Sequence, residues 1–100
     1  MRYYSSIRID PALCRAILVA IESDPKAGSG QGLQIVIDGY DWSTIGQHVA
    51  YLWDEELIDG IDATNMQSPH KEILVRDITP NGRKYLDETE PEPPKRKIGF

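Results

Sequence analysis

Carboxylates are the side chains in this sequence whose number and spacing come closest to a chemical site. Four of them fall within six positions, at Asp54, Glu55, Glu56 and Asp59. A catalytic carboxylate pair needs one member in an apolar environment, because desolvation raises its pKa enough to let it donate a proton. A run of acids at the end of a helix is more typical of a solvated surface. No nucleophile–base pair stands out elsewhere, and we expect no enzymatic activity.

Soft metal ligands are few, because the sequence holds only Cys14, His48 and His70. None has a partner at the spacing of a zinc site, so no metal and no cofactor is predicted. We expect Cys14 in the core and His48 to be a packed, hydrogen-bonded histidine. A single cysteine also excludes an internal disulfide and favours a cytoplasmic location.

The glycine-rich stretch at residues 28–32, Gly-Ser-Gly-Gln-Gly, invites comparison with a phosphate-binding loop. Such loops follow a strand and open a helix, whose N-terminal N–H groups face the anion. Here a predicted helix precedes the loop and a predicted strand follows it. The Lys-Ser/Thr pair of a P-loop is also missing. We interpret the stretch as a linker and infer no small-molecule substrate.

Composition indicates one globular domain. The chain has 100 residues, of which 40% are hydrophobic and 27% charged, values ordinary for a folded soluble protein. The net charge of −5 disfavours non-specific attraction to nucleic acid or anionic lipid. The longest apolar run, residues 16–21, is too short to span a bilayer. No membrane association is therefore expected.

Capping residues and hydrophobic periodicity predict the secondary structure. Asp-Pro and Thr-Pro pairs are typical helix starts, and Pro25 ends the first helix because it disfavours helical geometry in the preceding residue. The predicted elements are a helix from Pro11 that ends before Asp24, a strand over 33–37, a helix that follows Asp41, strands over 58–62 and 73–78, and a helix from Pro80 to about Asp87.

The order helix-strand-helix-strand-strand-helix predicts an α+β, winged-helix-like domain over residues 10–87. A second helix normally precedes the recognition helix of this fold, but only residues 38–40 are available here, so we expect it to be truncated or missing. Residues 1–9 are predicted to be an N-terminal extension, and the Pro- and charge-rich residues 88–100 a disordered tail. The expected core is Leu13, Ile17, Ile21, Ile35, Val49, Leu52, Ile73 and Leu86.

Several stretches match a known pattern: residues 18–22, 37–40, 45–52 and 57–58, and above all 78–87, Ile-Thr-Pro-Asn-Gly-Arg-Lys-Tyr-Leu-Asp. The last resembles the closing signature LT-x-x-G-x-x-F-L-D of a family of small uncharacterised bacterial and phage proteins, a domain of unknown function. The resemblance covers about residues 10–87. It implies a winged-helix-like fold and no activity. The family usually has glycine where Glu56 stands, which implies strain or a different cap at that helix end.

Residues 41–62 occupy the place of the recognition helix and first wing strand, yet they hold six carboxylates and no Lys or Arg. A helix inserted in DNA normally brings basic side chains to phosphates and base edges. We therefore expect a non-catalytic regulatory or adaptor module that binds another protein, or a second copy, through this helix. Trp53 is expected to pack inward. The candidate contact residues are Thr44, Gln47, Tyr51, Asp54 and Glu55.

DNA binding by a prokaryotic or phage transcriptional regulator is the alternative. The fold class favours it, but only by analogy. The phosphate contacts would then have to come from basic residues outside the central segment. The candidates are Lys71, Arg76, Arg83 and Lys84.

Overall fold

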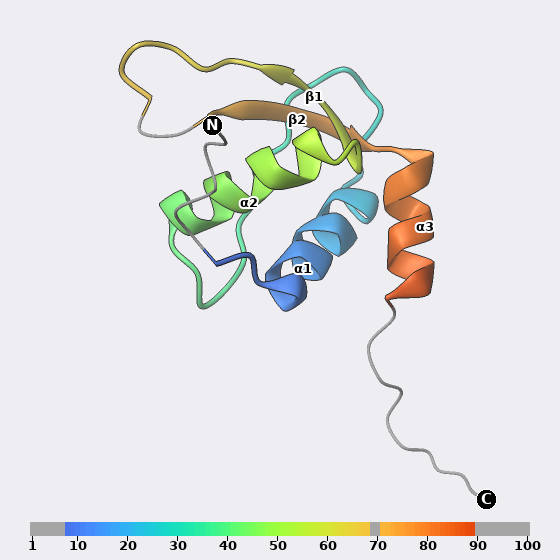
Figure 1. Cartoon of the computed structure of the whole chain (residues 1–100). Helices are drawn as coiled ribbons and strands as arrows, with labels where there is room; N and C mark the ends of the chain where they lie inside the picture. Colours follow the sequence, from blue (N-terminus) through green and yellow to red (C-terminus); the bar gives the residue numbers. More distant parts are fainter. Residues whose placement is uncertain (1–7, 69–70, 90–100) are drawn as a thin grey trace, which may run out of the picture.

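The computed structural model describes residues 8–68 and 71–89. These residues form an α+β fold of three helices and one two-stranded antiparallel sheet, which confirms the predicted α+β class. The hairpin lies over α2, α2 lies over α1, and α3 stands at the end of the sheet (Figure 1). Most of the predicted N-terminal extension and tail falls outside the described residues. The elements are α1 (Pro11–Glu22), α2 (Trp42–Asp54), β1 (Ile58–Asp62), β2 (Ile73–Ile78) and α3 (Pro80–Glu88).

Each helix begins at the capping residue that the sequence predicts. The side chain of Asp10 accepts a hydrogen bond from the Ala12 N–H, and that of Asp41 accepts one from the Thr44 N–H. Thr79 caps α3 in the same way. These bonds satisfy N–H groups that have no partner within the helix. Residues 38–40 form a turn, and the described chain has no helix between α1 and α2.

The end of α2 is a left-handed turn at Glu56, whose φ is 63°. The Leu57 N–H bonds the Leu52 carbonyl and the Glu56 N–H bonds the Trp53 carbonyl, both at 3.0 Å. This pair of bonds is the Schellman arrangement, in which glycine usually takes the left-handed position. A glutamate there is strained, as the resemblance to the family implied.

The stretch at residues 78–87 holds the start of α3 against the end of α2. The Thr79 hydroxyl donates to the Glu56 carbonyl at 2.8 Å and accepts from the Gly82 N–H at 3.0 Å. A Cβ on Gly82 would overlap the Leu57 carbonyl oxygen. Thr and Gly are therefore needed here because the first turn of α3 packs directly on the chain that leaves α2.

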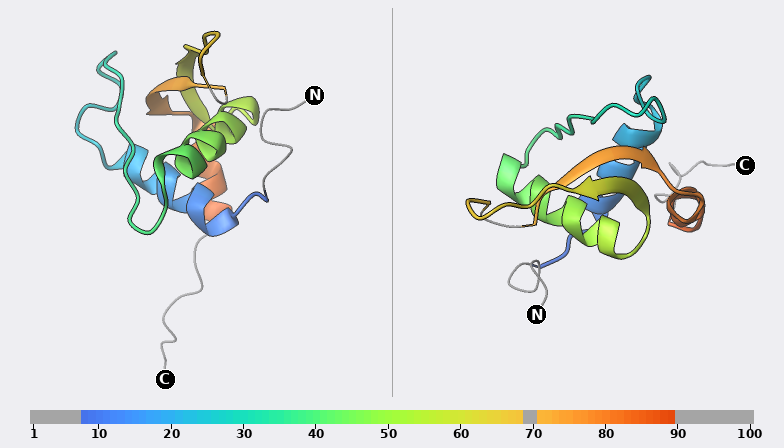
Figure 2. Two further views of the ribbon diagram at one scale, coloured as in Figure 1. Left: turned by 90° about the vertical axis from the view of Figure 1, so that its left-hand side faces the viewer. Right: turned by 90° about the horizontal axis from the view of Figure 1, so that it is seen from above.

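The predicted strand at 33–37 does not form, and this part of the predicted element order was wrong. The Leu33 N–H donates to the Val75 carbonyl at 2.8 Å, but no further described backbone bond joins residues 34–37 to β2. Without repeated bonds there is no ladder. Ile35 and Ile37 instead pack on the core from an extended segment. Figure 2 shows this segment running beside β2 without joining the sheet.

One apolar core lies between the helices and the hairpin. Six of the eight predicted core residues are buried in it, whereas Ile35 and Ile73 are half-buried at its border. Within the described ranges no helix is long and apolar enough to cross a membrane. The core cluster is Leu13, Cys14, Ile17, Leu18, Ile21, Leu33, Ile45, Val49, Leu52, Ile58, Val75, Ile78 and Leu86.

Candidate functional site

The five predicted contact residues of α2 do not share one open face. Thr44, Gln47 and Tyr51 are half-buried, and only Asp54 and Glu55 are exposed. Tyr51 packs against the core cluster. The Gln47 amide donates to the Ser43 hydroxyl at 3.3 Å, one turn earlier in the same helix. Much of this surface is therefore engaged within the domain.

Asp54 belongs to a small cluster that joins α2 to the hairpin. The ammonium of Lys71 lies 3.6 Å from the Asp54 carboxylate and 5.1 Å from the centre of the Trp53 ring. The Trp53 indole N–H donates to the Gly60 carbonyl at 3.2 Å, so Trp53 does pack inward. A cation above an indole and beside a carboxylate is stabilised by both. Lys71 is thus turned toward the domain's own acid.

The other basic candidates come from different elements. Arg83 on α3 lies 3.9 Å from the Glu22 carboxylate. Arg76 on β2 is half-buried, and its Nε has no hydrogen-bond partner among the described residues. Lys84 is exposed on α3. Two of the four candidates thus have an acid beside them.

His48 is buried and hydrogen-bonded, as predicted, with 1% of its surface exposed. Its Nε2 accepts from the Asp10 N–H at 3.0 Å, so its Nδ1 carries the proton toward the Thr44 carbonyl, 2.8 Å away. Asp10 in turn accepts from the Tyr40 hydroxyl at 3.0 Å, and this bond lowers the pKa of Asp10 and raises that of Tyr40. The network ties the start of α1 and the 38–41 turn to α2.

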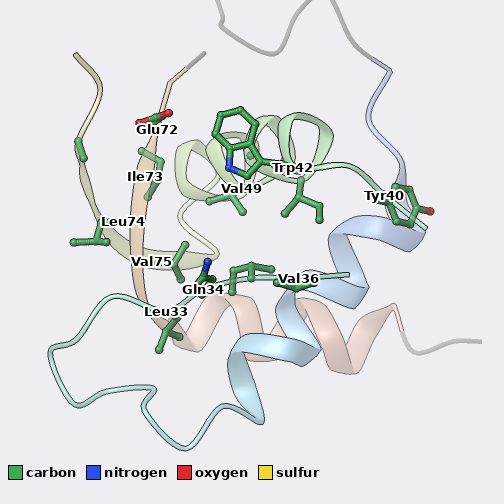
Figure 3. Close-up of a pocket in the computed structure, with 14 residues that line it drawn as sticks. Leu33, Gln34, Val36, Tyr40, Trp42, Val49, Glu72, Ile73, Leu74 and Val75 are labelled. Atoms are coloured by element: carbon green, nitrogen blue, oxygen red, sulfur yellow. The ribbon is translucent and has the colours of Figure 1, made fainter. Parts of the chain in front are cut away.

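An apolar groove opens where the extended segment at residues 34–37 diverges from β2. It has a volume of about 470 Å³ and is drawn in Figure 3. Its rim exposes large side chains, with 75% of Val36, 67% of Trp42 and 46% of Leu74 accessible to solvent. Glu72 is the one charged residue among those that line it. The lining residues are Leu33, Gln34, Ile35, Val36, Tyr40, Trp42, Ile45, Gly46, Val49, Ala63, Glu72, Ile73, Leu74 and Val75.

Sequence reasoning did not predict this groove. Four separate segments line it: residues 33–36, the 38–41 turn, the first half of α2, and the hairpin with the residues flanking its strands. A local signal was present in Trp42, which stands at the first helical position and outside the apolar stripe of α2. That position predicts an exposed Trp42, but it does not predict which residues lie around it, because these are brought together by the tertiary fold.

Residues 8–93 match a family described as "Hypothetical protein (DUF2513)". The chain belongs to the DUF2513 family. No curated protein matches it, and no solved structure does either. The match confirms the resemblance to a domain of unknown function.

In this DUF2513 chain the closing stretch at residues 78–87 has a structural role, because it holds α3 against the end of α2. Thr79 and Gly82 join α2 to α3 and lie outside the groove lining. The candidate site of this DUF2513 domain is thus formed by other residues, chiefly the exposed apolar side chains around Trp42.

Proposed function

We propose that this DUF2513 chain is a non-catalytic regulatory or adaptor module that binds another protein, with the apolar groove as its contact surface. The exposure of Trp42, Val36 and Leu74 around one groove carries the proposal. Contiguous apolar surface of this kind marks interaction sites on soluble proteins. Tryptophan and tyrosine are also the side chains most often found at binding hot spots.

The free energy gained on burial favours the groove over the acidic end of α2 as the contact surface. A tryptophan buries roughly 150–250 Å² at roughly 25 cal/mol per Å². Covering the 67% of Trp42 that is exposed would therefore contribute about 2.5–4 kcal/mol by these coefficients. An exposed ion pair contributes about 0–1 kcal/mol. Asp54 and Glu55 can select a partner by charge, but the groove supplies the larger driving force.

DNA binding is the weaker alternative. None of the described residues that line the groove is Lys or Arg, and Lys71 and Arg83 have carboxylates of this same chain beside them. Affinity for a duplex depends on cations that neutralise phosphates. An electrophoretic shift series on mixed duplex at increasing salt tests this alternative. Tight, sequence-selective binding that survives the uncharged substitution Val36→Ser would favour it over the groove.

Site-specific photocrosslinking in the source cells tests the proposal directly. A photoreactive amino acid at Val36 is expected to capture a defined protein. Val19 on α1 is the matched control, since it is an exposed valine outside the groove lining, with 43% of its surface accessible. A third probe at Glu55 reports on the acidic end of α2. Adducts at Glu55 alone, or the same adducts at Val19 and Val36, would overturn the groove as the contact surface.

A further inference from the structure

We propose that the groove takes an extended segment of the partner protein, which adds to the free edge of β2 and brings a Lys or Arg to Glu72. This inference rests on the proposed function and specifies how the partner binds. Three features carry it: the direction of the Ile73 backbone, the shape of the groove, and the charge at its end.

The hydrogen-bond pattern fixes which way the β2 backbone points. The Glu72 carbonyl accepts from the Ala63 N–H at 2.8 Å, so the N–H and C=O groups of Glu72 point toward β1. Backbone direction alternates along a strand, so the N–H and C=O of Ile73 face the opposite edge. The Val75 carbonyl, two residues on, accepts from Leu33 on that edge. Within the described residues, Ile73 has no backbone partner there.

The shape of the groove suits an extended chain. One wall is the β2 edge around Ile73, and the other is the extended segment at residues 33–36. Leu33 closes one end through its bond to Val75, and beyond it the two walls separate. Figure 3 shows Val49 on α2 and Val36 on the extended segment, on two sides of this space. A strand laid along Ile73 would pair with its N–H and C=O and place alternate side chains on this apolar floor.

The charge of the groove favours a cationic partner. Among the described residues Glu72 is the one charged side chain that lines the groove, and it stands at one end of the space in Figure 3. The described residues carry 14 acids and 7 basic side chains. Their net negative charge therefore also attracts a cationic segment at long range. The segment we infer therefore alternates apolar residues with at least one Lys or Arg.

The test begins with selection of random dodecapeptides, displayed on phage, against the full chain. Enriched peptides should share apolar residues at every second position and a Lys or Arg. Their affinity, measured by calorimetry, should fall at least about tenfold in Val36→Lys and stay unchanged in Val19→Lys. Glu72→Gln should weaken them about threefold or more, whereas Glu88→Gln on α3 should not.

Two measurements then separate the binding mode from the function. N-methylation at successive peptide positions should weaken binding by up to about tenfold with a period of two, because strand pairing uses alternate N–H groups. The Ile73 amide should also become protected from hydrogen exchange. A flat N-methyl scan with unchanged Ile73 exchange would refute strand addition, while the Val36→Lys effect would still support the groove. Binding insensitive to Val36→Lys, or no enriched peptide, would refute the extended-segment proposal, whereas the crosslinks at Val36 decide separately whether the groove binds a protein.

Discussion

Replacing Glu56 with glycine should stabilise the domain by about 1 kcal/mol. The backbone of Glu56 is left-handed, with φ at 63°, a conformation that costs a side-chain-bearing residue roughly 1–2 kcal/mol. Glycine removes that strain but gives the unfolded chain more freedom, which costs roughly 0.4–1 kcal/mol. The hydrogen bond that Thr79 donates here goes to the Glu56 main-chain carbonyl, so the substitution leaves it intact. Loss of a negative charge at a helix C-terminus adds a smaller gain.

Urea denaturation followed by tryptophan fluorescence measures this effect, with Glu56→Ala as the control. Alanine removes the same charge but keeps the strain, so the difference between the two variants isolates the left-handed turn. We expect Glu56→Gly to exceed Glu56→Ala by about 1 kcal/mol, with an unchanged denaturant slope. In thermal unfolding the same gain corresponds to roughly 4–8 °C for a domain of this size. Equal stability of the two variants would refute the proposed strain.

The packing of the core leads to three further predictions, two for substitutions and one for the reactivity of a thiol. Gly82→Ala should destabilise the domain by at least about 2 kcal/mol, because its Cβ would overlap the Leu57 carbonyl; Asn81→Ala, at an exposed position, should change the unfolding free energy little. His48→Leu should cost about 1–3 kcal/mol in the same assay, since it leaves the half-buried Asp10 N–H without its acceptor. Burial, aided by the nearby Asp10 carboxylate, raises the pKa of the Cys14 thiol to about 11. At pH 8 a disulfide reagent should therefore label the native protein at least about a hundredfold more slowly than the urea-unfolded chain.

The local features of the fold could be predicted because they depend on short-range chemistry. Asp10, Asp41 and Thr79 each cap a helix, since their side chains need only reach an N–H two or three residues away. The hairpin strands also formed at residues 58–62 and 73–78, as predicted. The burial of His48 followed from its place beside the apolar stripe of α2. Its acceptor role toward Asp10 did not, because that contact joins residues 38 positions apart.

The strand predicted at residues 33–37 shows why the groove could not be foreseen. Its β-branched residues are suited to extended backbone, and the backbone is extended, but a strand also requires a partner edge in register. Here residues 33–37 bond β2 once, through Leu33, and the chain then leaves β2 to reach the cap of α2 at Asp41. The edge of β2 that this strand would have covered remains open at Ile73. The same departure both refutes the predicted third strand and creates the apolar space in which a strand from another protein would fit.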